Sequence, residues 1–264
     1  MNNKTKEKTK KWYKGYIDAM FKAIFCNAKN RKLLKWFIEW CLNKKVEIIE
    51  VYPPEIIKPN IYVKNKTLDV LLIVDGEMVN LEINSGYYNG LHIRNAGYIF
   101  SKYAEVVKVG EVYKKMTNFI QINFTKDLPK DYPLVGEYYI IDEKTEIKYV
   151  DNFKIIEYNI DKIFDECYKK GKKEYNFVAI LNASKEELDK LCVDDEFLVE
   201  YKKEVMRMNE NIKFTTWISE EEDAEKVTNT LIHNAKEDGE SIGLKKGEKI
   251  GEKNKAIEIA QSLI

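Results

Sequence analysis

Two acidic side chains, Asp69 and Glu82, stand in apolar stretches on either side of the dipeptide Asp75-Gly76. Asp-Gly between two runs rich in valine, isoleucine and leucine is among the strongest signals for a two-residue β-hairpin loop. Counting outward from that loop pairs Asp69 directly with Glu82. Paired residues on an antiparallel ladder have Cβ atoms about 5 Å apart, and like charges there are destabilising unless something bridges them. The stretch therefore predicts a hairpin whose two carboxylates face each other.

A divalent cation held by Asp69 and Glu82 is the most economical reason for such a pair. Mg²⁺ binds carboxylate oxygens and keeps waters that can react. Asn84, two residues beyond Glu82, projects from the same face of the strand. Two alternatives stay open: the acids face solvent at the strand ends, or an odd-length loop shifts the register so that Asp69 faces Ile83.

Two amphipathic helices precede the hairpin. Apolar residues recur at helical spacing over 17–25 and again over 33–42, with Asn30 as a candidate cap for the second helix. Asp18 and Lys22 lie one turn apart on the first helix, a spacing typical of a surface ion pair. Both helices are expected to contribute mainly to the core.

A glycine-bearing turn and a helix from about Leu91 to Val107 follow the hairpin. Arg94 and Lys102 share a polar face of that helix. Residues 118–124 then alternate as a strand. Further strands are predicted at 46–51, 137–141, 147–150 and 154–159, and further helices at 160–170, 184–191 and 196–209. This order of elements indicates an α/β fold with a mixed sheet.

The last part of the chain has a different pattern. A capping box at Ser219 and Glu222 predicts the start of a helix with an apolar stripe. Glycine then recurs every fourth residue from Gly239 to Gly251, which predicts either a marginal helix that becomes firm on pairing or a flexible linker. Self-association through these helices, as a homo-oligomer, is one hypothesis that the stripe supports.

Charge is balanced over the 264 residues, with 44 Lys+Arg and 44 Asp+Glu, so net charge indicates no class of partner. Its distribution is uneven, because lysines dominate residues 1–14. A basic arm of this kind can lie along the phosphates of a nucleic acid, or it can be a solvated leader. We divide the chain into this arm (1–14), a globular domain (15–215) and a helical tail (216–264).

Other classes of chemistry find little support. The four cysteines form no CxxC pair, and the two histidines, His92 and His233, lack the spacing of a zinc site or a catalytic triad. No glycine-rich phosphate loop is present. The chain also lacks a secretory signal and a run of about 18 apolar residues, so we expect a cytoplasmic protein without a membrane span.

Several motifs occur in an order that resembles a known family. They are DAMFKAIF, LDVLLIVDGEMVNLEIN, the arginine of LHIRNAGY, GEVYKKMTNFIQINF and the tail with glycine at every fourth residue. Together they resemble the PD-(D/E)xK nucleases of the transposase and recombination-promoting type. The resemblance implies a restriction-endonuclease-like α/β fold, a mixed sheet flanked by helices with a helical C-terminal tail, and DNA as the partner. It also implies a Mg²⁺ site, in which Mn²⁺ substitutes, formed by Asp69, Glu82 and the backbone carbonyl of Ile83.

One position departs from the pattern of that family. Asn84 stands where the wider superfamily has lysine and this family usually has glutamine. Asparagine supplies no positive charge, so either the metal provides the electrostatic stabilisation or a cation from the following helix substitutes. Arg94 and Lys102 are the candidates, and either would also serve to contact nucleic acid.

The sequence thus favours a Mg²⁺-dependent DNA endonuclease of the mobile-element type. Asp69, Glu82 and Asn84 are its predicted catalytic residues. A catalytically impaired nucleic-acid-binding or assembly protein on the same fold is the alternative, in which the acid pair is a relic.

Overall fold

A computed structural model describes residues 11–52, 56–57, 66–67, 69–105, 118–193 and 195–220, with helical residues, single or in pairs, between 222 and 255. The described residues fall into two compact units, Met1–Asn211 and Ile212–Ile264, and each is treated by itself. Residues 1–10 of the predicted basic arm and the predicted helix end at Val107 lie outside the described residues. The predicted domain boundaries stay predictions.

The first unit contains a six-stranded mixed sheet and a separate two-stranded ribbon of β2 and β3. The strands are β1 (Ile48–Tyr52), β2 (Ile56–Ile57), β3 (Lys66–Thr67), β4 (Val70–Val74), β5 (Glu77–Asn84), β6 (Phe119–Thr125), β7 (Val135–Tyr138) and β8 (Phe153–Asn159). In space the order of the large sheet is β1-β4-β5-β6-β8-β7. Its centre, β5, β6 and β8, is parallel, and its outer strands pair antiparallel.

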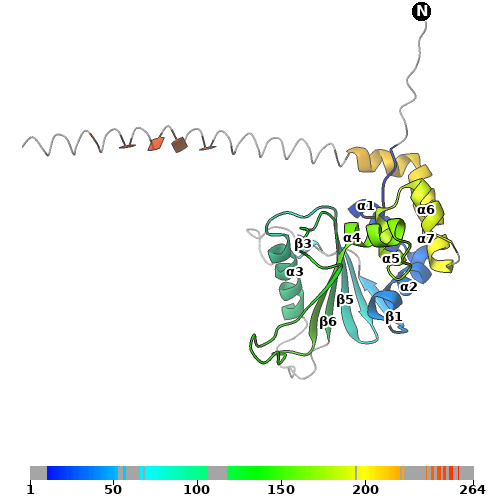
Figure 1. Ribbon diagram of the computed structural model, residues 1–264, viewed down its shortest axis with the longest axis horizontal. Coiled ribbons are helices and arrows are strands. Elements are labelled where there is room, and N and C mark those ends of the chain that lie inside the picture. Colours follow the sequence, from blue (N-terminus) through cyan, green and yellow to red (C-terminus); the bar gives the residue numbers. More distant parts are fainter. Residues whose placement is uncertain are drawn as a thin grey trace, which may run out of the picture. The chain divides into compact units, whose positions relative to one another are not determined.

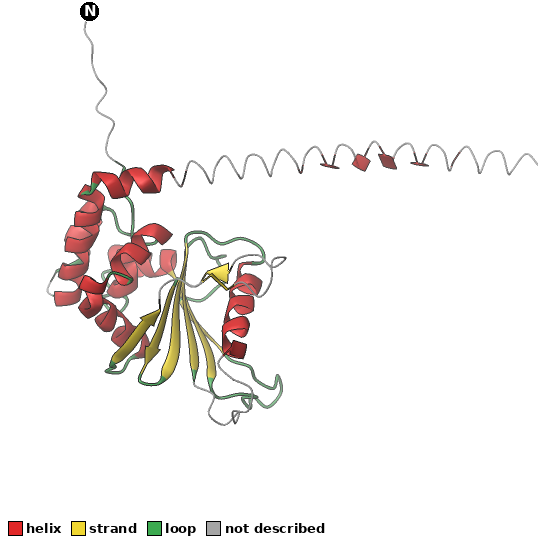
Figure 2. Cartoon of the chain, turned by 180° about the vertical axis from the view of Figure 1, so that it is seen from behind, coloured by secondary structure: helices red, strands yellow, loops and turns green. Residues whose placement is uncertain are grey.

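Helices cover both faces of this sheet, with α3 on one side and the other helices on the opposite side (Figures 1 and 2). The α-helices are α1 (Asp18–Phe25), α2 (Arg31–Leu42), α3 (Leu91–Glu105), α4 (Ile160–Phe164), α5 (Asn176–Ala179), α6 (Lys185–Leu191) and α7 (Glu196–Glu210). Single turns of other helix types are η1 (Ala28–Asn30), η3 (Asp165–Lys169) and η4 (Ile180–Asn182). The predicted α/β layer architecture is confirmed.

The main hydrophobic core lies between the sheet and α1 and α2. Phe21 and Phe25 of α1 are fully buried, and Phe37 of α2 stacks on Phe25 with ring centroids 4.7 Å apart. Phe37 also contacts Phe124 of β6 at 5.2 Å. These aromatic contacts hold α1 in a fixed position against the sheet.

The opposite face of the sheet changes character along the strands. Near the beginnings of the parallel strands, Ile99 of α3 packs on Phe119 and Phe153. Toward the carboxyl ends of the same strands the residues beneath α3 are polar and buried. This is the end of an open α/β sheet at which ligands usually bind.

The predicted hairpin is confirmed over the five residue pairs of its ladder, which ends one position before Asp69 and Glu82. β4 and β5 pair in the predicted register, from Val74 opposite Glu77 to Val70 opposite Leu81. The loop residues Asp75 and Gly76 both have positive φ angles, 50° and 80°, as a tight two-residue loop between twisted strands requires.

Two local predictions were wrong, the strand at 147–150 and the helix start at Ser219, whereas the helix at 160–170 and the cap position of Asn30 are confirmed with differences in detail. Residues 147–150 form no strand but a single bridge, Ile141 with Lys148, and the predicted helix 160–170 is α4 followed by the wider turn η3. Asn30 occupies the cap position of α2, yet its side chain bonds the Ile24 carbonyl and Glu204 instead. In the second unit helix already covers 212–220, so Ser219 lies inside it.

The described part of the tail is helical, including Gly239 and Gly251. No helix among the described residues is both long and apolar enough to cross a membrane. All four cysteines are free thiols.

We predict that Phe37→Ala lowers the free energy of unfolding by about 3–5 kcal/mol, because it empties a site enclosed by aromatic rings. Urea denaturation followed by circular dichroism measures the loss. Ile93→Ala is the control, since Ile93 on α3 is 79% exposed, and it should change stability by less than about 0.5 kcal/mol. Equal losses in the two variants would contradict this assignment of the core.

Candidate active site

The two predicted carboxylates lie where the ladder of β4 and β5 ends. Asp69 directly precedes β4, and its Oδ2 accepts a hydrogen bond of 2.8 Å from the backbone N–H of Ile83. Asp69 is 5% exposed and Glu82 is 3% exposed. The solvent-facing alternative and the shifted register are therefore both wrong.

Glu82 is a buried carboxylate with few partners. Its Oε2 accepts one long hydrogen bond, 3.4 Å from Asn80 Nδ2, and its Oε1 lies 3.7 Å from Arg94 Nη2. Burial and then the Asp69 carboxylate raise the pKa of Glu82. Burial and then Asp18 raise the pKa of Asp69. Two acids that repel each other out of contact with water create a place where a cation is stabilised.

The sequence did not single out Lys22 as a site residue, yet it is the cation nearest to Asp69. Its Nζ lies 2.8 Å from Asp69 Oδ1 and 2.8 Å from Asp18 Oδ1. Burial lowers the pKa of Lys22, but Asp69 and Asp18 outweigh that effect and raise it. Lys22 and Asp69 are brought together only by the packing of α1, so the local spacing of Asp18 and Lys22 suggested no more than a surface ion pair.

Asn84 and Arg94 meet as the sequence suggested. Arg94 Nη2 donates a hydrogen bond of 2.6 Å to Asn84 Oδ1. The guanidinium also lies over the rings of Tyr88 and Tyr98, at 5.8 and 5.6 Å from their centroids. Lys102 follows about two turns later, roughly 12 Å further along the helix axis, toward the apolar end of α3. The structure thus places Arg94 next to Glu82. Lys102 lies further along the same helix, away from the two carboxylates.

Polar side chains, all of them buried except Arg94 of α3, form a ring of contacts across this face of the sheet. In order around it are Glu82, Asn80, Gln121, Asn123, Glu157, Thr125, Asn84 and Arg94. The approach of Arg94 to Glu82 closes it. The ring connects the predicted site to a second buried carboxylate, Glu157, which the sequence analysis did not single out.

The residues present fit a hard divalent cation. Among the described residues no three histidine, cysteine, aspartate or glutamate side chains are grouped to hold a metal ion. Mg²⁺, however, is commonly bound by only one or two carboxylates together with waters and substrate phosphates. The pair Asp69 and Glu82 provides those carboxylates, and Glu82 has unused acceptor capacity. The third predicted ligand, the backbone carbonyl of Ile83, belongs to the same residue whose N–H donates to Asp69.

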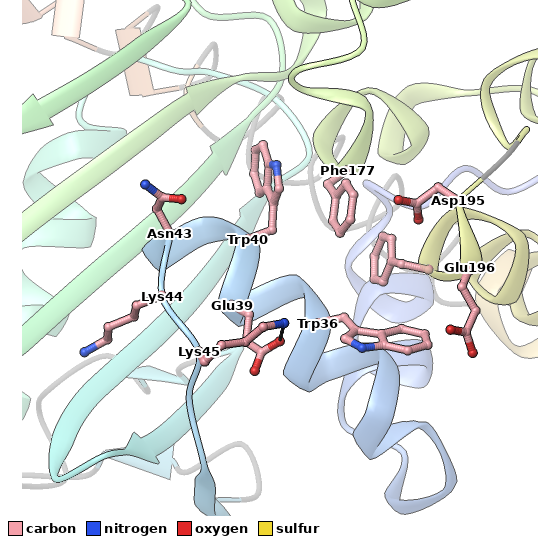
Figure 3. Close-up of a pocket in the computed structure, with 10 residues that line it drawn as sticks. Trp36, Glu39, Trp40, Asn43, Lys44, Lys45, Phe177, Asp195 and Glu196 are labelled. Carbon is pink, nitrogen blue, oxygen red and sulfur yellow. Dashed lines mark hydrogen bonds and ion pairs between the residues drawn. The ribbon is translucent and has the colours of Figure 1, made fainter.

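A cavity of about 590 Å³ lies elsewhere, between α2 and the start of α7 (Figure 3). Trp36, Trp40 and Phe177 form its aromatic part. Its charged groups have partners, because Lys45 pairs with Glu39 at 2.9 Å. None of the predicted site residues lines this cavity.

We predict that stability falls as the pH rises, because Glu82 keeps its proton in the folded protein to a higher pH than in the unfolded chain. The free energy of unfolding declines between the ordinary glutamate pKa, about 4.3, and the raised value. Glu82→Gln should reduce this slope and stabilise the protein at alkaline pH by on the order of 1–2 kcal/mol. Urea denaturation at several pH values, with a chelator present, measures it.

Glu143→Gln is the matched control, because Glu143 lies exposed in a turn. It should leave the pH slope of the native protein unchanged. A Glu82→Gln variant with the native slope would show that Glu82 is not the group that titrates.

Comparison with known proteins places the chain in a family. The model of the PD-(D/E)XK nuclease family transposases matches residues 15–255. No curated protein and no solved structure matches the chain. The match covers most of the chain, and the observed mixed sheet flanked by helices is the restriction-endonuclease-like fold that the sequence resemblance implied.

Proposed function

Because the chain belongs to the PD-(D/E)XK nuclease family transposases, we propose that it is a Mg²⁺-dependent endonuclease that hydrolyses phosphodiester bonds in DNA. The observation that carries this proposal is the buried pair Asp69 and Glu82, beside two cationic side chains. We also infer that its DNA substrates belong to mobile elements, since the family is described as transposases.

Asp69, Glu82 and the Ile83 carbonyl are the proposed ligands of the metal. A Mg²⁺ ion held there would supply Lewis-acid chemistry at the scissile phosphate, the attacking water and the departing 3′ oxygen. The N–H of Ile83 keeps the Asp69 carboxylate oriented throughout.

Lys22 is proposed to supply the positive charge that Asn84 lacks. Its ammonium contacts Asp69, so it lies next to the position of the metal and of a phosphate bound there. A lysine has a flexible stem with three donors, and it can exchange a carboxylate oxygen for a phosphate oxygen. The role usually filled from the strand would then be filled from α1.

Asn84 is proposed to act mainly by positioning Arg94. Its Oδ1 accepts from Arg94, and its Nδ2 donates to Thr125 Oγ1 at 2.9 Å, so both ends of the amide are engaged. The guanidinium is thereby held beside Glu82 as a clamp for a phosphate oxygen. Arginine does not deprotonate in proteins, so it does not act as a base.

We predict that Asp69→Asn or Glu82→Gln lowers plasmid nicking by on the order of 10²–10³-fold or more, since each removes a metal ligand while keeping the shape of the side chain. Conversion of supercoiled to open-circular plasmid in Mg²⁺ measures the rate. Circular dichroism checks the fold, and Glu143→Gln should cut normally. Nicking that persists in both variants, or in the presence of a chelator, would refute the assignment.

We predict that Lys22→Met lowers the nicking rate by about 10²-fold while Mg²⁺ binding is kept or strengthened, because an ammonium no longer competes for Asp69. Calorimetric titration with a duplex present measures the binding. Lys32→Met is the control, since Lys32 lies exposed on α2 and pairs with Glu196. Loss of metal binding together with activity would instead make Lys22 a structural partner of Asp69.

Nucleic-acid binding without cleavage is the alternative outcome. DNA binding that weakens strongly with salt and does not depend on metal would support this alternative. The pair Asp69 and Glu82 would then be a relic of an active site.

A further inference from the structure

A second cavity, of about 280 Å³, lies beneath α3 on the same face of the sheet as Glu82. Its lining residues are His92, Asn95, Ala96, Asn123, Tyr132, Tyr138, Ile155 and Glu157. We propose that this cavity binds one unstacked base of the nucleic acid, recognised through Asn95 and Glu157 and enclosed by aromatic rings.

The size and walls of the cavity suit a single aromatic ring system. Its volume is just below the range of about 300–1,000 Å³ for drug-sized ligands, so it admits one heterocycle. The rings of His92 and Tyr132 lie 5.4 Å apart at one wall, and Tyr87 extends this cluster. Proteins that read unpaired bases stack them on such side chains.

Gly136 on β7 allows the ring of Tyr138 to lie against the strand. A Cβ at Gly136 would come within 2.6 Å of the Tyr138 hydroxyl. The absence of a side chain there lets Tyr138 form the second aromatic wall of the cavity.

Asn95 offers an unused hydrogen-bond donor. It is 2% exposed, and its Nδ2 has no hydrogen-bond partner among the described residues. The orientation of the amide is determined by Arg94, which donates to Asn95 Oδ1 at 3.2 and 3.1 Å. Because arginine has donors alone, the oxygen must face Arg94 and the nitrogen must face away from it.

Glu157 offers unused acceptors beside that donor. It is 3% exposed, and its oxygens accept from Thr125 and, at 2.8 Å, from Asn123. A carboxylate has about four acceptor positions, so capacity remains. A donor and an acceptor together match the hydrogen-bonding edge of an unpaired base, where an amino group or a ring N–H lies beside a ring nitrogen or a carbonyl.

Charged ligands match the cavity less well. The Glu157 carboxylate repels an anion, and the Asn95 Nδ2 donor has nothing to bond in a bare cation. The cavity of Figure 3 is different again, because its charged groups already have partners, as Lys45 has in Glu39 and Glu196 has in Lys32.

The cavity lies close to the proposed cleavage site. Glu82, Asn123 and Glu157 are in register across three parallel strands, so Glu157 is two strand spacings, roughly 9–10 Å, from Glu82. That is about three base steps of a DNA strand. Arg94 contacts both Asn95 and Asn84, so one side chain joins the two places.

The inference rests on the proposed function only in taking nucleic acid as the ligand. Its test is equilibrium binding of fluorescent duplexes to the full chain in a chelator, where nothing is cut. One duplex carries a single unpaired cytosine, one carries an abasic residue at the same position, and one is fully paired. An unpaired base needs little energy to enter a pocket.

We predict that the cytosine bulge binds about tenfold more tightly than the abasic bulge, from stacking and hydrogen bonding of one base. Tyr138→Ala, which removes a wall, and Ala96→Leu, which fills the cavity, should reduce the ratio to below about twofold. Both should leave the affinity for the paired duplex unchanged. Tyr149→Ala is the control, because Tyr149 is 85% exposed and does not line the cavity.

The proposal is overturned if the native chain does not distinguish cytosine from an abasic residue, or if Ala96→Leu keeps the full preference. Plasmid nicking in Mg²⁺ on the same samples separates the two proposals. A cytosine preference without nicking supports the base pocket and contradicts the nuclease. Nicking without a cytosine preference supports the nuclease and contradicts the base pocket. Failure to bind any duplex contradicts both proposals.

Discussion

Repulsion between two buried carboxylates is the constraint around which this unit is arranged. Asp69 and Glu82 are buried beside the end of the ladder of β4 and β5, and the Asp69 carboxylate raises the cost of ionising Glu82. The protein compensates from two sides. Lys22 approaches Asp69 from α1, and Arg94 approaches Glu82 from α3. The two helices lie on opposite faces of the sheet, so the acid pair links both layers of the fold.

This arrangement also explains how a motif without its usual lysine stays electrostatically complete. Asn84 carries no charge where lysine would, and it makes two hydrogen bonds instead: it accepts one from Arg94 and donates one to Thr125. The positive charge then comes from the flanking helices. A cation on a helix is positioned by the packing of that helix, so the aromatic core around Phe37 contributes to the site although it lies away from it.

The part of the site that the sequence revealed was local. The Asp75-Gly76 loop and the alternation of β5 were enough to place Glu82 and Asn84 on one face, because pairing register follows from loop length. Lys22 was not recognisable, since its contact with Asp69 depends on how α1 packs. Glu157 was equally hidden, because one acid in an alternating strand usually faces water. Self-association through the tail stays a prediction.

The half of the polar ring that runs from Arg94 to Glu157 has a direction. Arg94 can only donate, and an ionised Glu157 can only accept. Between them Asn84 and Thr125 each accept from one neighbour and donate to the next, in a single sense. Rotating the Asn84 amide so that its nitrogen and oxygen exchange places would set the nitrogen, a donor, against the donors of Arg94. The orientation of the arginine beside Glu82 is therefore coupled, through three hydrogen bonds and without movement of the backbone, to the protonation state of a carboxylate two strands away.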